Sequence, residues 1–246
     1  MALLEVCCGD IRSVKNAAVG GADRIELCSS LETGGVTPSA GLIREAVRIF
    51  PGPVNVLIRP RSGDFLYTPE EVDVMIEDVK MAVALGASGI VIGALTTDGS
   101  VDKATVKRLI SVAGGLPVTF HRAFDMCADS EQAMRDIIES GCSRVLTSGQ
   151  KASAMEGSDS LRRMVVKSEG RIIILAGGGG SSENVVELIG RTGVDEVHAS
   201  AKRMLPSDMR FRRGGVSMGK KDADEYQFPC TDSSEVRLIK ERLERI

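Results

Sequence analysis

Short runs rich in Val, Ile and Leu alternate along this chain with longer stretches of helical periodicity. The apolar runs predict eight buried strands. These strands are expected at Leu3–Cys7, Arg24–Cys28, Val54–Arg59, Gly89–Gly93, Val118–His121, Arg144–Thr147, Ile172–Leu175 and Glu196–Ala199. The pattern therefore indicates a protein in which strands and helices alternate.

The clearest helical stretch runs from Pro69 to Leu85, with Thr68 as its expected N-cap. Further helices should start near Pro38, Asp102, Asp129 and Ser181, and a last one should cover Ser233–Arg245. Eight strands alternating with helices at this length predict a closed (β/α)8 barrel of TIM type, because open doubly wound sheets usually have fewer strands. We expect one domain over residues 1–246.

An internal repeat supports the barrel. A glycine precedes each even-numbered strand, at Gly21, Gly86, Gly141 and Gly193. A glycine that ends a helix in the left-handed conformation explains each copy locally. The repeat indicates architecture and carries no chemistry of its own.

One segment departs from the alternation. Residues 202–232 show charges, a Gly pair and two prolines but no clear period, so we expect a long irregular loop that leaves the mouth of the barrel. Loops of this length are usually functional or mobile.

The composition of the chain argues against several classes of function. The 246 residues carry a formal charge of -3, contain no Trp and only two Tyr, and have no sustained basic run, which argues against a nucleic-acid partner. No apolar stretch approaches the roughly 20 residues of a membrane span. The start of the chain lacks the pattern of a secretory signal, and the six cysteines form no C-x-x-C pair. We expect an intracellular protein with reduced thiols.

Candidate chemistry gathers at the C-terminal ends of the strands, where (β/α)8 barrels place their active sites. Alternation along the first two strands predicts that Glu5, Cys7, Glu26 and Cys28 point into the lumen. Other polar residues that follow strands three, five and eight are Arg59, Arg61, Asp64, His121, Asp125, His198 and Ser200.

This set supports more than one interpretation. Neighbouring strands lie about 4.8 Å apart, so Cys7 and Cys28 at equivalent strand ends could share a soft ion such as Cu(I), with His121 or His198 as a third ligand. Both thiols could equally be small buried hydrophobes. The carboxylates, arginines and His121 could be the acid, base and anion clamp of an enzyme, or a structural ion network in which Arg59 compensates buried carboxylates.

A glycine run follows the seventh strand. Gly177, Gly178 and Gly179 lie just before an expected helix, where backbone amides commonly bind phosphate in barrels, and Ser200 lies after the eighth strand. We favour an anion site here over a merely tight connection.

Several segments resemble, in order, the CutC family of copper homeostasis proteins. They are Gly21–Cys28, Gly34–Ser39, Ile58–Phe65, Thr119–Asp125 and Leu146–Gly149, within a match from about Glu5 to Gly219. The resemblance implies a cytoplasmic (β/α)8 barrel that forms homo-oligomers, with nuclear presence left open. It also implies Cu(I) handling, with Cys7 and Cys28 as ligands. This chain has Ala199 where some relatives have a Cys after the last histidine, so that third sulfur is missing.

Two functional hypotheses follow. The first is a Cu(I)-binding protein of copper homeostasis with thiolate ligands at the barrel mouth. The second is a barrel enzyme that acts on a small anionic or phosphorylated metabolite. In the second, His121 or Glu26 transfers a proton, Asp125 assists, and Arg59, Arg61 and the glycine run hold the anion.

Overall fold

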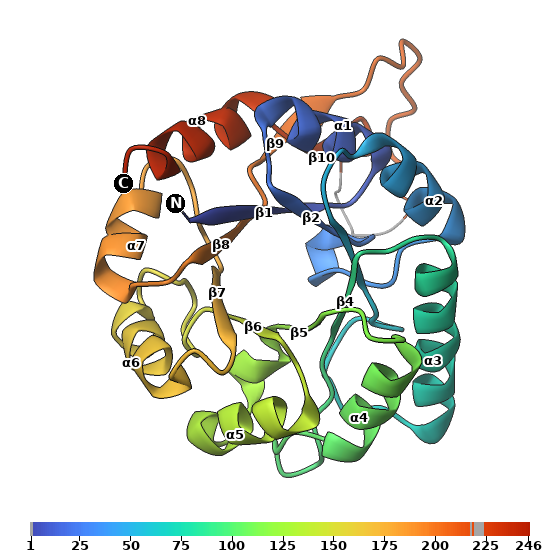
Figure 1. Cartoon of the computed structure of the whole chain (residues 1–246). Helices are drawn as coiled ribbons and strands as arrows, with labels where there is room; N and C mark the ends of the chain where they lie inside the picture. Colours follow the sequence, from blue (N-terminus) through green and yellow to red (C-terminus); the bar gives the residue numbers. More distant parts are fainter. Residues whose placement is uncertain (1, 217, 219–223) are drawn as a thin grey trace.

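Eight parallel strands close into a barrel in sequence order, and helices form a ring around it (Figure 1). This computed structural model describes residues 2–216, 218 and 224–246. The strands are β1 (Leu3–Cys8), β2 (Arg24–Leu27), β3 (Val54–Leu57), β4 (Gly89–Ile92), β5 (Val118–Phe120), β6 (Arg144–Thr147), β7 (Ile173–Gly177) and β8 (Glu196–Ala199). Pairing of β8 with β1 closes the barrel, which confirms the predicted fold class.

The helices follow the predicted alternation. They are α1 (Ile11–Gly20), α2 (Ala40–Ile49), α3 (Pro69–Ala84), α4 (Lys103–Val112), α5 (Ser130–Ser140), α6 (Ser158–Ser168), α7 (Val185–Thr192) and α8 (Ser233–Leu243), with short 3-10 helices η1 (Leu31–Thr33) and η2 (Arg122–Met126). Thr68 caps α3 as expected, in a reciprocal capping box with Glu71. Helix α7 begins at Val185 rather than near Ser181, because a turn occupies the intervening residues.

The repeated glycines occupy the conformation that the sequence predicted. Gly21, Gly86, Gly141 and Gly193 have φ of 83°, 90°, 97° and 73°. Each follows a helix and turns the chain toward an even-numbered strand, where a side chain would strain the backbone.

The core lies between the strands and the helix ring. Leu4, Val6, Ile25 and Leu27, on the outward faces of β1 and β2, are completely buried in one apolar cluster with the helices. The alternating residues of the same strands face the lumen, where Glu5 and Arg24 meet. The inward and outward assignments made from the sequence are therefore confirmed for these strands.

The segment 202–232 is not irregular throughout, which corrects the sequence expectation. Strands β9 (Lys202–Pro206) and β10 (Gln227–Thr231) form an antiparallel pair outside the barrel. The pair is held by backbone hydrogen bonds, and the side chains of β9 are largely exposed, so no hydrophobic period marks it. Asn16 of α1 donates to the carbonyl of Thr231, which ties β10 to the helix ring.

No helix within the described part of the chain is long and apolar enough to cross a membrane.

Candidate functional site

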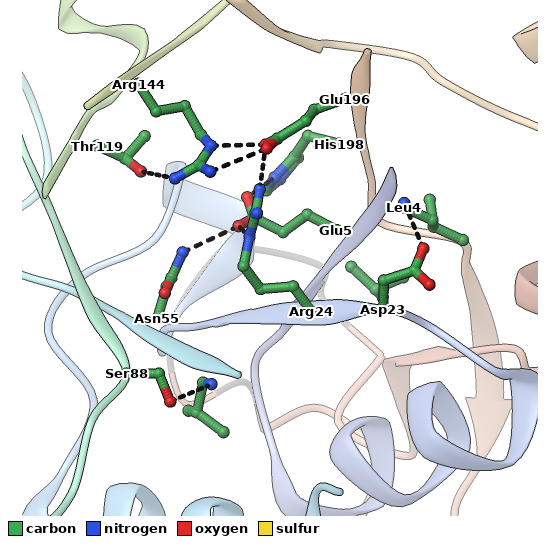
Figure 2. Close-up of polar contacts among 12 residues, drawn as sticks. Leu4, Glu5, Asp23, Arg24, Asn55, Ser88, Thr119, Arg144, Glu196 and His198 are labelled. Carbon is green, nitrogen blue, oxygen red and sulfur yellow. Dashed lines mark hydrogen bonds and ion pairs between the residues drawn. The ribbon is translucent and has the colours of Figure 1, made fainter. Parts of the chain in front are cut away.

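A buried ion network occupies the lumen beneath the mouth (Figure 2). Arg24 of β2 places Nε 2.5 Å from Glu5 of β1 and one Nη 2.5 Å from Glu196 of β8. Arg144 of β6 holds the same Glu196 through two contacts of 2.5 and 2.9 Å. The two guanidinium groups thus balance the two carboxylates, which offsets the cost of burying charge.

Glu5 joins this network to the residues above it. Its carboxylate also accepts from Asn55 and lies 2.9 Å from Nδ1 of His198 (Figure 2). Burial alone would raise the pKa of Glu5. The contacts with His198 and Arg24 outweigh burial and lower the pKa of Glu5 to about 2.

His198 is held as a cation by three acidic neighbours. Burial opposes its charge, but Cys7, Glu5 and Glu26 together raise its pKa well above the usual value. Its Nδ1 atom hydrogen-bonds with Glu5 at 2.9 Å. The Glu5 carboxylate and the His198 imidazole therefore form a polar pair below the cavity, whose wall also includes Cys7.

Glu26 is the carboxyl group that this network leaves unmatched. It is 6% exposed, and its Oε2 atom has no hydrogen-bond partner among the described residues. Burial, together with the negative charge of Glu5, raises the pKa of Glu26 to about 7, against the opposing charges of His198 and Arg24. Glu26 therefore changes charge near neutral pH.

A cavity of about 370 Å³ opens above these residues at the C-terminal ends of the strands. Apolar side chains such as Leu57, Phe65 and Leu146 form part of its wall. The polar and charged side chains of the wall are Cys7, Glu26, Thr33, Arg59, His121, Arg122, Asp125 and His198. A concave pocket in which apolar walls surround convergent polar groups is typical of a small-molecule site.

His121 is neutral in this cavity. Burial and the charge of Arg59 lower its pKa to about 3. The backbone amide of Ala123 donates to Nδ1 at 3.1 Å, while Nε2 has no partner among the described residues. Gly93 at the end of β4 leaves room for the ring, since a Cβ there would lie 2.4 Å from Cε1 of His121.

Arg59 connects the loops that follow β2 and β3. Its Nη atoms donate to the carbonyls of Thr33, Gly35 and Gly63 at 3.1, 2.8 and 2.7 Å. These acceptors carry no formal charge. Its Nε is buried and without a partner among the described residues, so one donor remains for a ligand.

Asp125 lines the cavity but its oxygens are already engaged. It accepts from the Thr147 hydroxyl at 2.5 Å, from Ser148 and Gln150 amides, and from Arg122 Nε at 2.7 Å. These contacts anchor the β6–α6 loop to η2. Its predicted catalytic role stays a prediction, and the geometry favours a positioning role.

Arg61 and Asp64 lie outside this cavity. Arg61 pairs with Glu71 at 2.5 Å and with Asp64 at 3.1 Å, on the outer side of the β3–α3 loop. Asp64 is largely exposed. The structure therefore does not bring this predicted pair together with Arg59 at the cavity.

The two thiols do not lie at equivalent strand ends, which corrects the sequence interpretation. The residue opposite Cys7 is Glu26, so Cys28 lies further toward the mouth. The reason is the stagger that closing a barrel imposes on neighbouring strands. Cys7 lines the cavity, whereas Cys28 is fully buried against Leu57 and Val91, and its Sγ lies 3.6 Å from the carbonyl of Cys8.

The glycine run lies at the side of the cavity. A Cβ on Gly178 would lie 3.6 Å from Cζ of Arg122, which itself lines the cavity. Ser200 and Gly179 line a separate hollow, where Glu235 of α8 accepts from the amide and hydroxyl of Ser182. One amide near this turn is thus already bound to a carboxylate, and anion binding at Gly177–Gly179 stays a prediction.

Arg24, Arg144 and Glu196 of the lumen network were not predicted from the sequence. Arg24 and Glu196 share the inward faces of β2 and β8 with Glu26 and His198, so the same alternation could have identified them. Within the described residues, one group has the spacing of a metal site, namely Glu5, Glu26 and His198, whose ligand atoms lie within 4.8 Å of one another. Its oxygen and nitrogen donors suit harder ions than Cu(I).

Comparison with known proteins identifies the relatives of this chain. The CutC family matches residues 2–203. The CutC family protein of Aliivibrio fischeri is 45% identical over 98% of both chains, and that of Vibrio cholerae is 47% identical over 93% of this chain and 91% of the relative. The crystal structure of CutC from Streptococcus agalactiae is 32% identical, with a TM-score of 0.78, over 81% of this chain and 99% of that one. The chain belongs to the CutC family.

Proposed function

We propose that this protein is an enzyme that removes a proton from a small anionic metabolite and returns one to it, with Glu26 as the base and the acid. The observation that carries the proposal is the carboxyl group of Glu26. It lines an open cavity, has an unpartnered oxygen, and has a pKa raised to about 7. A general acid or base works best when its pKa lies near the working pH.

The surroundings of Glu26 suit this role. Atoms of His198 and Glu5 lie within 4.8 Å of its carboxylate, and the cationic ring of His198 would stabilise the ionised form. Glu5 holds that ring in place at 2.9 Å. The protonation of Glu26 is therefore linked to the charges of His198 and Glu5.

The charge of the cavity favours an anionic ligand. His198 and Arg122 each have a carboxylate partner, in Glu5 and Asp125. Among the described residues, the hydrogen bonds of Arg59 go to backbone carbonyls and no carboxylate forms an ion pair with it, so its buried positive charge has no counterion there. A negative group on the ligand would offset that charge, and a phosphate could extend past Arg122 toward Gly178.

The test is proton exchange with a defined mixture of small metabolites. The protein is incubated in D2O with carboxylates, sugar phosphates and carbonyl compounds, and deuterium uptake and new products are followed by NMR and mass spectrometry. We expect at least one compound to change, and Glu26→Gln to slow the change by ~100-fold or more. Glu32→Gln, an exposed substitution at the same end of the barrel, is the matched control. A mixture that stays unchanged, or a fully active Glu26→Gln variant, contradicts the proposal.

A second candidate function is Cu(I) binding at Cys7. Two observations favour it: Cys7 and His198 line the same cavity, and the Streptococcus agalactiae relative is described as a candidate copper homeostasis protein. Sulfur and imidazole ligands suit Cu(I). Burial raises the pKa of Cys28 far above its usual value, so its recruitment as a second ligand would require the metal to displace its proton.

Competitive titration of reduced protein with Cu(I) against a calibrated chelator tests this candidate. One tight equivalent per chain should weaken sharply in Cys7→Ser and in Cys28→Ser. Cys8→Ser is the matched control, because the Cys8 thiol contacts the Val6 carbonyl and does not line the cavity. Binding that is weak, or unchanged in both ligand variants, removes the two-thiolate site.

A further inference from the structure

Three buried polar atoms without a partner among the described residues belong to side chains that line one cavity. Among the described residues, the buried side-chain atoms that lack a hydrogen bond are Glu26 Oε2, Arg59 Nε, His121 Nε2 and the hydroxyl of Tyr67. The first three belong to side chains that line the 370 Å³ cavity. An unsatisfied buried polar atom costs on the order of 1–3 kcal/mol, so three around one space point to a ligand that completes them.

The protonation of His121 follows from its contacts. Nδ1 accepts the Ala123 amide proton, so Nδ1 carries a lone pair. Since the ring is neutral, its proton must reside on Nε2, the unpartnered atom. The side chains that line the cavity therefore carry two unpartnered N–H donors, His121 Nε2 and Arg59 Nε, together with the unpartnered oxygen of Glu26.

The side chains of His121 and Arg59 both pack against Phe65. The ring of Phe65 lies 5.0 Å from the ring of His121 and 5.0 Å from the guanidinium carbon of Arg59. Both side chains are 5% exposed, and hydrogen bonds to the backbone hold each of them in place. Fixed donors in a site shielded from water are the arrangement that stabilises an oxyanion.

We propose that the substrate is a small carbonyl compound with a hydrogen on the carbon next to the carbonyl, and that the site enolises it. This inference rests on the proposed role of Glu26. The Glu26 carboxylate takes the α-proton and becomes the acid. The C–H electron pair forms the C=C bond, and the carbonyl π pair moves to oxygen, where His121 Nε2 and Arg59 Nε donate to the enolate. Return of the proton from Glu26 to carbon restores the carbonyl compound, with solvent deuterium in its place after exchange in D2O, and return to oxygen gives the enol; neither needs another reactant.

The neutral state of His121 fits this step. A neutral imidazole can donate to a developing enolate without adding a full charge to the free site, and a glutamate base with a neutral histidine is an established pairing in an enolising barrel. The positive charge of Arg59 gains an opposite charge from the substrate when the carbonyl oxygen becomes negative in the enolate. The donors therefore bind the enolate more tightly than the carbonyl, as catalysis requires.

The first experiment reads the tautomer of His121 without any ligand, by 15N NMR of imidazole-labelled protein between pH 5 and 8. The inference predicts a neutral ring with its proton on Nε2 throughout this range. A proton on Nδ1, or a ring that titrates within the range, would overturn it.

The second experiment measures α-proton exchange into D2O with three probes, which are pyruvate, hydroxyacetone and dihydroxyacetone phosphate. At least one should exchange faster than in buffer. His121→Asn keeps an acceptor for the Ala123 amide but removes the Nε2 donor, and should slow exchange by ~100-fold or more. His121→Gln restores a donor near the Nε2 position and should recover part of the rate.

The outcomes separate the two proposals. Enolisation is wrong if no probe exchanges, or if His121→Asn exchanges at the wild-type rate while Glu26→Gln does not. In either case, a change in another compound of the metabolite mixture that depends on Glu26 would still support proton transfer. Equal loss in both His121 variants, with their folds intact by circular dichroism, would also overturn the donor role. If Glu26→Gln exchanges normally, the proposed function itself fails.

Discussion

Glu5 Oε1 lies 2.9 Å from Nδ1 of His198, and this contact gives Glu5 a different protonation state from Glu26, its neighbour in the lumen. Glu5, paired with His198 and Arg24, has a pKa near 2. Glu26, within 4.8 Å of the same histidine but without a hydrogen bond at Oε2, has a pKa near 7. Two carboxyl groups whose environments separate their pKa values are a pattern of acid and base chemistry.

Glu26→Gln should stabilise the protein in alkaline solution. The pKa of Glu26 is raised from 4.5 to about 7, so the folded state holds a proton that the unfolded state has lost between these pH values. Stability from this group therefore falls as pH rises from about 4.5 to about 7, by about 3 kcal/mol. Urea unfolding should show Glu26→Gln close to wild type at pH 4.5 and about 3 kcal/mol more stable at pH 8. If the variant and the wild type differ in stability by the same amount at pH 4.5 and pH 8, Glu26 titrates with an ordinary pKa.

Glu5→Gln should be strongly destabilising. It removes the partner of Arg24 and His198 in the lumen and leaves buried charge uncompensated, at a cost of about 3–5 kcal/mol. The pKa of Glu5 is lowered from 4.5 to about 2, so its own contribution is present above pH 4.5 and lost as pH falls through 2. The difference from wild type should thus shrink in acid unfolding curves. A loss below 1 kcal/mol at pH 6 would contradict the network.

The same variant should lower the pKa of His198. Glu5 is one of the groups that raise this pKa, so the stability supplied by His198 is present below pH 6.5 and lost as pH rises through the folded value. In Glu5→Gln this loss should begin at lower pH. Histidine NMR titration measures the shift, with His121 of the same protein as an internal reference.

Gly93→Ala should disturb the cavity through His121. The new Cβ would lie 2.4 Å from Cε1 and 2.5 Å from Nδ1 of the ring, so the ring must move. We expect the His121 resonances to shift, exchange activity to fall by at least 10-fold, and stability to drop by about 1–3 kcal/mol. Gly190→Ala in α7, where a Cβ meets nothing within 4 Å, is the control and should leave all three unchanged or slightly raise stability. Unchanged His121 resonances in Gly93→Ala would contradict the close approach.

Arg59→Lys should loosen two loops at once. A lysine cannot make the three contacts to Thr33, Gly35 and Gly63 that the guanidinium makes. Hydrogen exchange should accelerate at amides of residues 33–36 and 61–65 while the barrel strands stay protected. Uniform protection in both loops would show that Arg59 does not tie them together.

The strand and helix pattern was sufficient to predict the barrel because it reflects burial on the outer face of each strand. The same alternation placed Glu5, Cys7 and Glu26 in the lumen. It could not reveal β9 and β10, whose pairing depends on backbone hydrogen bonds and of which β9 is largely exposed.

The site was less predictable than the fold. Strand stagger, which no local pattern encodes, set Cys7 opposite Glu26 rather than Cys28. Loop geometry decided that the Asp125 oxygens would anchor a neighbouring loop and that Arg61 would turn to Glu71. Such choices depend on three-dimensional neighbours, so residue type and strand position alone could not separate ligand-facing groups from structural ones.

The most direct test of the account is the titration of the Glu26 carboxyl group itself. Protein labelled with 13C at glutamate side-chain carboxyl carbons is titrated by NMR, and the Glu26 signal is assigned by its loss in Glu26→Gln. The account predicts a midpoint near pH 7. A midpoint near 4.5 would show that Glu26 is an ordinary carboxylate at neutral pH and would contradict its role as the acid and base of this site.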